Sequence, residues 1–196
     1  MGEVLLVRHG ETQWSQTGRH TGRTDVALTA RGEEQARALG PILSQRSIGL
    51  VLTSPLRRAV RSAQLAGLRF AQPDADLVEW DYGSYEGRTT AEIQEERPGW
   101  TVWQDGVLDG ETVGQVGDRA DRVLERARAF LARDDRDVAL VGHGHALRVL
   151  AARWLALPPV TGCRFRLDTG ALSVLSEEHH WAALLHWNVS PAALGP

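Results

Sequence analysis

The sequence predicts an α/β fold, a three-layer sandwich in which helices cover both faces of a mostly parallel central sheet. Three apolar runs lead to this prediction, at residues 4–7, 48–53 and 138–142, and segments with helical patterns separate them. Continuous apolar runs of this length are typical of strands buried on both faces of a parallel sheet. The first and third runs lead into His9 and His143. Because ligands bind at the carboxyl edge of such sheets, these strand ends are candidate site positions.

Length and composition favour one folded unit. The 196 residues are 42% hydrophobic, which is enough for one sizeable core, so we expect a single domain over residues 1–196. The formal net charge of -3 and the pI near 6.2 give no reason to expect nucleic acid or an anionic membrane as a partner. The apolar opening is too short for a signal peptide or a membrane span, so we expect a cytoplasmic protein.

Two residue types exclude whole classes of chemistry. Cys163 is the single cysteine, which rules out an intramolecular disulfide and a multi-cysteine zinc site, and we expect it to be a small buried residue. All 22 basic residues are arginine. The absence of lysine excludes the P-loop and every Schiff-base mechanism.

The first half of the chain predicts two helices between strands. Residues 13–28 read as a long loop above the first strand end, and a helix follows with Thr29 as its cap. A second helix is expected to begin at Pro55 with Ser54 as its cap. Residues 68–78 then predict another strand.

The second half begins with an irregular insertion at about residues 80–110, which we expect to act as a lid and to contain one short helix near 90–96. A long amphipathic helix is predicted from Thr112 to Arg133, and another follows the third apolar run to about Leu155. The end of the chain predicts three short strands and a mobile tail, at 163–167, 172–176, 182–187 and 190–196.

The polar residues at these strand ends predict a compact cationic pocket. If the strands are neighbours, Arg8, Arg58 and a protonated His143 surround a neutral His9, and Glu79 joins them from another segment. Such a pocket suits a phosphate dianion, because one guanidinium group can donate hydrogen bonds to two phosphate oxygens at once. Nearby positive charge also disfavours protonation of His9, which leaves its ring nitrogen nucleophilic.

The chain resembles the histidine phosphatase superfamily, also called the phosphoglycerate mutase-like family. The resemblance rests on an ordered set of motifs: Leu5-Leu-Val-Arg-His-Gly-Glu-Thr12, Ser54-Pro-Leu-Arg-Arg-Ala59, Glu79 before Tyr82-Gly-Ser-Tyr-Glu-Gly87, and Gly142-His-Gly144. It spans nearly the whole chain and implies the phosphoglycerate mutase-like version of the fold.

The resemblance implies a role for each matching residue. His9 becomes a transient phosphohistidine, Arg8, Arg58 and His143 bind the phosphoryl group, and Glu79 moves the proton. Neither a metal ion nor a cofactor is implied, although His143 and His145 together also resemble a pair of metal ligands. The other expected substrate-binding positions are Ser15, Thr21, Gly22, Trp80, Tyr82, Gly144 and His145.

Three departures from the mutases favour hydrolysis over mutase activity. The insertion has no lysine and paired arginine to hold a substrate carboxylate, Ser15 stands where those mutases usually have asparagine, and the chain is short. Its motifs are similar to the acid phosphatase and sedoheptulose-bisphosphatase-like branch, which implies a small phosphorylated sugar or related metabolite as substrate. Cofactor-dependent phosphoglycerate mutase is the alternative, and a non-catalytic phospholigand-binding module ranks last. The oligomeric state and the substrate stay open.

Overall fold

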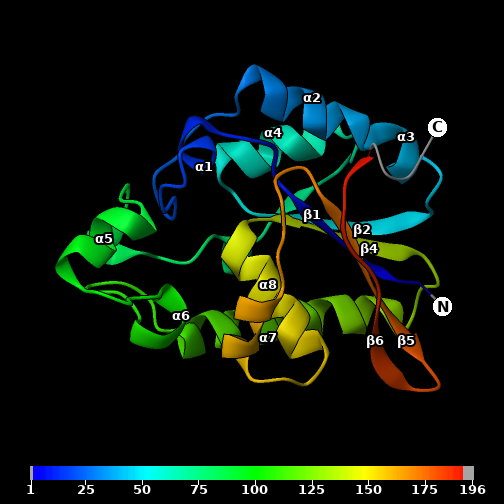
Figure 1. Cartoon of the computed structure of the whole chain (residues 1–196). Coiled ribbons are helices and arrows are strands. Elements are labelled where there is room, and N and C mark those ends of the chain that lie inside the picture. Colours follow the sequence, from blue (N-terminus) through cyan, green and yellow to red (C-terminus); the bar gives the residue numbers. More distant parts are fainter. Residues whose placement is uncertain (1, 192–196) are drawn as a thin grey trace.

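A six-stranded sheet forms the centre of the computed structural model, which describes residues 2–191 (Figure 1). The strand order is β3-β2-β4-β1-β5-β6. The first four strands are parallel, β5 runs antiparallel to β1, and β6 runs antiparallel to β5. The predicted α/β fold with a mostly parallel sheet is confirmed. The strands are β1 (Val4–Arg8), β2 (Ile48–Thr53), β3 (Gln72–Pro73), β4 (Asp137–Gly142), β5 (Leu172–Glu178) and β6 (Trp181–Val189).

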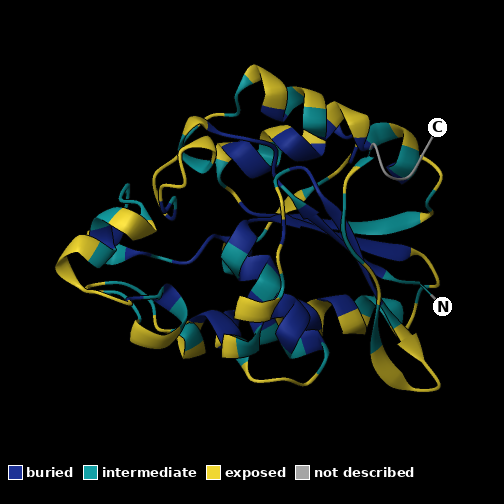
Figure 2. Ribbon diagram, viewed as in Figure 1, coloured by how far each residue is buried: buried dark blue, intermediate teal, exposed yellow. Residues whose placement is uncertain are grey.

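Helices cover both faces of the sheet (Figure 1). Alternate residues of β1 enter different cores: Leu5 and Val7 pack with α3 and α4, whereas Val4 and Leu6 pack with α7 and α8. All four side chains are fully buried, and Figure 2 shows the central strands as the buried middle of the molecule. The helices of the first face are α2 (Ala30–Ala38), α3 (Gly40–Leu43) and α4 (Arg57–Leu65), and those of the second are α7 (Val113–Leu131) and α8 (Gly144–Trp154).

Threonine residues cap five of the helices within residues 2–191. Thr29 accepts a hydrogen bond from the Gly32 N–H at the start of α2, as predicted. Thr89 and Thr112 form capping boxes at the starts of α5 (Thr90–Glu96) and α7. Two short helices lie in segments predicted to be irregular, namely α1 (Gln13–Gln16) and α6 (Val102–Asp105).

The predicted cap at Ser54 is wrong. Helix α4 begins at Arg57 with Leu56 as its cap residue, so Ser54 lies outside the helix. The Ser54 Oγ accepts the N–H of Leu56 at 3.3 Å and bonds to the ring of His143 at 2.7 Å. Cys163 is exposed rather than buried.

Two predicted strands are also largely absent. Of residues 68–78 only Gln72 and Pro73 pair with the sheet, because proline offers no N–H to continue the ladder and Asp74 caps the 3-10 helix η1 (Ala75–Leu77). Residues 159–164 form the 3-10 helix η3 (Pro159–Arg164) in place of a strand at 163–167. There the carbonyl groups of Gly162 and Cys163 accept hydrogen bonds from Arg148, so they are not free for strand pairing.

The 80–110 insertion lies at the end of the sheet opposite the β5-β6 hairpin (Figure 1). It contains α5, α6 and the 3-10 helix η2 (Gly83–Tyr85). Residues 192–196 of the predicted mobile tail lie outside the described residues. Within residues 2–191, no helix combines the length and the apolar character needed to cross a bilayer.

Candidate active site

The register of the parallel strands brings the two histidines together. Strands β1 and β4 pair with Arg8 opposite Gly142, so the residues that follow, His9 and His143, leave the sheet at the same level. Their ring centroids lie 5.1 Å apart. Strand β2 contributes Ser54, whose Oγ lies 2.7 Å from Nε2 of His143. The predicted convergence of the strand ends is therefore observed.

His9 has one engaged and one accessible ring nitrogen. Its Nδ1 lies 2.7 Å from the Gly10 carbonyl oxygen, which accepts only, so Nδ1 carries the proton. Burial, together with the positive charges of Arg58 and Arg8, holds the pKa of His9 well below its usual 6.5. Nε2 makes no hydrogen bond to the described residues and is not among their buried, unpaired atoms. The ring is thus neutral, and the lone pair of Nε2 lies on the side of the ring away from the Gly10 carbonyl group.

His143 differs from the prediction in its protonation state. Burial and the neighbouring Arg58 lower its pKa well below 6.5, so the ring is neutral in this structure. Arg58 donates from Nε to Nδ1 of His143 over 3.1 Å, which places the ring proton on Nε2. Nε2 then donates to Ser54. Burial and the positive charges of Arg58 and Arg8 thus disfavour the protonated ring that the sequence predicted.

Arg58 lies behind His143 rather than in the wall of the cavity. Its guanidinium is fully buried and donates to three backbone carbonyl groups, those of Thr21, Gly22 and Thr24, at 2.9 to 3.0 Å. Arg58 thereby ties the 21–24 loop to His143. Its positive charge is placed beside the site, but most of its donors are already occupied.

Arg8 contributes a guanidinium that is only partly satisfied. It donates to the Leu167 carbonyl, and its Nε is buried without any partner. A Cβ atom at Gly144 would lie 3.1 Å from Cζ of Arg8. The absence of a side chain at Gly144 therefore lets Arg8 pass close to the first turn of α8. An unpaired buried donor is costly, so this guanidinium is suited to receive an anion.

Glu79 lies at the N-terminus of α8. Its carboxylate accepts hydrogen bonds from the N–H groups of Trp80, His145 and Ala146 at 2.8 to 3.0 Å. The first turn of a helix favours a negative group, and three donors fix the position of this one. Gly144 and His145 were predicted to bind phosphate at this helix start. The backbone N–H of His145 is already bound to Glu79, whereas that of Gly144 is not.

A buried ion pair holds the segment that carries Glu79. Arg119 donates to both carboxylate oxygens of Glu111, at 2.8 and 3.0 Å, and to the carbonyl of Val78. Glu111 also accepts the N–H of Asp81. Glu111 comes directly before the cap residue of α7. The cap is Thr112, and Glu111 supports the chain on both sides of Glu79.

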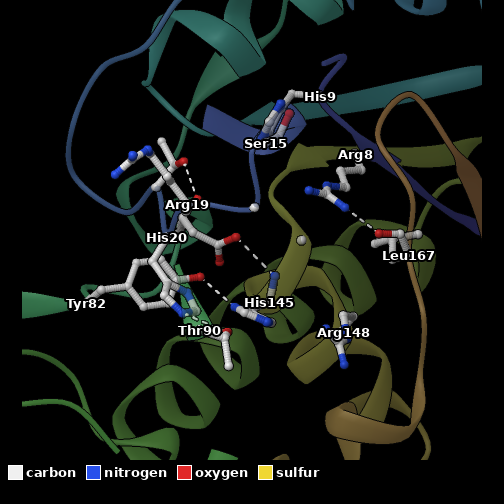
Figure 3. A pocket seen from close by; sticks show the side chains of 14 residues that line it. Arg8, His9, Ser15, Arg19, His20, Tyr82, Thr90, His145, Arg148 and Leu167 are labelled. Carbon is white, nitrogen blue, oxygen red and sulfur yellow. Dashed lines mark hydrogen bonds between the residues drawn. The ribbon is translucent and has the colours of Figure 1, made fainter. Parts of the chain in front are cut away.

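A cavity of about 250 Å³ opens beside His9 (Figure 3). Eight of the predicted site residues line it, and six others, four of them polar side chains, do so without having been predicted. The predicted group is Arg8, His9, Ser15, Thr21, Glu79, Tyr82, Gly144 and His145. The missed polar residues are Arg19, His20, Thr90 and Arg148. Arg148 follows His145 by three residues, so both lie on one face of the predicted helix. This spacing was the sequence signal that could have identified Arg148 as a site residue.

Two predicted substrate contacts do not reach the cavity. The Gly22 N–H donates to the carboxylate of Glu86 at 2.9 and 3.0 Å, so it is not free for a phosphate. Trp80 is fully buried in the core, and its Nε1 donates to the Glu111 carbonyl. Trp100 is buried likewise, whereas Trp103 lies under the guanidinium of Arg148. Most of the tryptophans in the insertion are therefore structural.

The buried His20 makes stability depend on pH. Burial lowers its pKa from 6.5 to about 4, so between these values the unfolded chain binds a proton that the folded protein does not. Stability is then lost as the pH falls below 6.5. Urea unfolding at pH 7 and pH 5 is expected to show about 2 kcal/mol less stability at pH 5 from this residue alone. His20→Phe removes that part of the loss, and an unchanged pH difference in the variant would contradict the assignment.

Comparison with known proteins identifies the family. A family model described as the histidine phosphatase superfamily (branch 1) matches residues 4–190. The chain belongs to this superfamily. An acid phosphatase of Mycobacterium tuberculosis is 45% identical over 90% of this chain and 87% of the relative. A sedoheptulose 1,7-bisphosphatase of Saccharomyces cerevisiae is 33% identical over 90% and 88%, and a probable phosphoglycerate mutase of Salmonella paratyphi A is 35% identical over 93% and 89%.

The fold is shared with solved structures of the superfamily. A structure of a Mycobacterium tuberculosis open reading frame superposes with a TM-score of 0.92 at 42% identity, and the match covers 97% of this chain and 98% of the other. The phosphoglycerate mutase-like fold that the motifs implied is thus confirmed.

Proposed function

We propose that this member of the superfamily is a phosphomonoesterase that hydrolyses small phosphate esters, sugar phosphates or related metabolites, through a phosphohistidine at His9. Phosphatases among its relatives support hydrolysis. The observation that carries the proposal is the neutral His9 ring with its accessible Nε2, beside the partly unpaired guanidinium of Arg8. A cytoplasmic location stays a prediction from the sequence.

In the first step Nε2 of His9 attacks the phosphorus atom. The N–P bond forms while the bond from phosphorus to the leaving oxygen breaks, and Glu79 delivers a proton to that oxygen. The phosphate dianion lies against Arg8, with the charge of Arg58 behind His143. The Nδ1–H bond to Gly10 holds the His9 ring in the required tautomer and stabilises the charge that the ring gains.

In the second step water attacks the phosphohistidine. Glu79, now a carboxylate, accepts a proton from the water, the new P–O bond forms, and the N–P bond breaks to restore His9 and release phosphate. Phosphoryl transfer depends mainly on positioning and charge stabilisation, so these steps use no metal ion. The negative charge of the phosphoryl group also favours protonation of His143.

Two substrates test hydrolysis against mutase activity. Release of p-nitrophenol from p-nitrophenyl phosphate is the expected result for the phosphomonoesterase. With 3-phosphoglycerate, tested with and without 2,3-bisphosphoglycerate, we expect no rapid formation of 2-phosphoglycerate. Rapid isomerisation without release of phosphate would overturn the proposal in favour of the mutase.

Gly144→Ala is expected to lower kcat/KM roughly tenfold, because sub-ångström displacement of a positioning group is costly. The new Cβ would lie 3.1 Å from Cζ and 3.3 Å from Nε of Arg8, so the guanidinium must shift. Gly114→Ala in α7 is the matched control, since its Cβ has only one neighbour, the Thr112 Oγ1 at 3.8 Å. Steady-state kinetics of both variants measure the effect, and equal rates would refute the close contact at Gly144.

A further inference from the structure

The cavity continues beyond the proposed phosphoryl site. Its volume of about 250 Å³ corresponds to roughly eight water molecules of ~30 Å³ each, which is more than one phosphoryl group fills. Tyr82, His145 and Arg148 line this further part together with Leu167. In Figure 3, Arg8, Arg148 and Leu167 lie on one side of the cavity, and Arg19, His20 and Tyr82 lie on the other. This space is available to the leaving group of a substrate bound at His9.

Arg148 is a fixed cation with unused donors. Its Nε and Nη2 donate to the carbonyl oxygens of Gly162 and Cys163, each at 3.0 Å, and its Cζ lies 4.7 Å from the centroid of the Trp103 ring. These contacts immobilise the guanidinium plane. Nη1 makes no hydrogen bond to residues 2–191 and is not among their buried, unpaired atoms. Because Arg148 lines the cavity, this nitrogen is a donor available to a bound anion.

No carboxylate of the described residues forms an ion pair with Arg148. Arg19, on the other side of the cavity, has Glu92 at 3.8 Å. Arg153, one and a half turns further along α8, is paired with Asp121 at 2.9 Å. Arg8 likewise has no carboxylate partner within residues 2–191, but a phosphoryl group at His9 neutralises it. Arg148 is then left as a half-buried positive charge with no carboxylate of the described residues within ion-pair distance, which is unfavourable.

His145 adds a second donor to the same part of the cavity. Its Nδ1 lies 2.5 Å from the Tyr82 hydroxyl. Burial raises the pKa of Tyr82 and lowers that of His145, so both groups are neutral. We assign the hydroxyl as the donor to Nδ1, which places the ring proton on Nε2. The Nε2–H has no partner within the described residues.

We propose that Arg148 and the Nε2–H of His145 form an anion subsite for the leaving group, so that the preferred substrates carry a second anionic group, a carboxylate or a second phosphate. This inference rests on the proposed phosphomonoesterase function. It makes Arg148 the residue that determines specificity between charged and uncharged leaving groups.

Three esters with the same carbon chain length test the subsite. They are 3-hydroxypropyl phosphate, 3-phosphonooxypropanoate and propane-1,3-diyl bisphosphate, which differ in having a neutral, a carboxylate or a phosphate group at the far end. The wild type is expected to show a higher kcat/KM for at least one anionic ester than for the neutral one. The two anionic esters distinguish the carboxylate from the phosphate.

Arg148→Gln is expected to reduce this preference at least tenfold, because charge-assisted hydrogen bonds are among the stronger polar contacts. Arg148→Lys keeps the charge and restores part of the preference. Arg153→Gln on the same helix is the matched control and leaves the preference unchanged, because Arg153 does not line the cavity. An equal loss for all three esters in Arg148→Gln would show a purely structural role and overturn the inference.

Inhibition of the wild type gives a second test that needs no variant. Propane-1,3-diyl bisphosphonate is expected to inhibit p-nitrophenyl phosphate hydrolysis with a lower inhibition constant than propylphosphonate. Equal constants would overturn the anion subsite and leave the phosphatase function intact. Absence of hydrolysis of every ester, p-nitrophenyl phosphate included, would overturn the proposed function itself.

Discussion

His9→Asn is expected to reduce kcat for p-nitrophenyl phosphate by roughly a thousandfold or more, the scale on which loss of a nucleophile acts. The variant lacks the ring nitrogen that attacks phosphorus. Its amide N–H can still donate to the Gly10 carbonyl, as Nδ1 of His9 does, so the fold and the position of Arg8 are expected to persist. The wild type, quenched during turnover, is expected to carry acid-labile phosphate that the variant lacks.

His180→Asn is the matched control for this substitution. His180 is exposed and has a φ of 69°, a conformation that asparagine tolerates well. Its activity is expected to equal that of the wild type. If His9→Asn retained a tenth of the wild-type rate with unchanged thermal stability, His9 would not be the nucleophile.

The elements at the strand ends could be predicted because their signal is local. A continuous apolar run followed by Arg8 and His9, or by His143, is visible in a window of a few residues. The register that sets Arg8 opposite Gly142 is not visible there, although parallel strands with similar ends make it the expected arrangement. The resemblance to the family supplied Glu79, which no local pattern marks.

The errors arise where distant contacts decide the outcome. Trp80 is buried because its Nε1 reaches the carbonyl of Glu111, thirty-one residues away. The side chain of Ser54 looks like a helix cap, but His143 lies within reach only after β2 and β4 have paired. In the sequence, Arg148 looks like any other charged residue on a helix. Its place in the cavity depends on how α8 packs against η3.

Glu79→Gln is expected to slow the hydrolysis of alkyl phosphates by roughly a hundredfold to ten-thousandfold, the range of general acid catalysis. The loss is expected to be smaller for p-nitrophenyl phosphate, because p-nitrophenolate is a stable anion that leaves without being protonated. A series of phosphate esters with leaving groups of increasing pKa measures this dependence. The slope of log kcat/KM against leaving-group pKa is expected to become steeper in the variant.

Glu111→Gln separates proton delivery from positioning. Glu111 does not line the cavity, but it bonds to Arg119 and to the N–H of Asp81, and Arg119 holds the carbonyl next to Glu79. Weakening this pair is expected to lower thermal stability and to reduce all rates by a similar factor. If Glu79→Gln also reduced every rate equally, its carboxylate would act only as the acceptor that fixes the start of α8. A steeper slope in Glu79→Gln alone assigns the proton to Glu79.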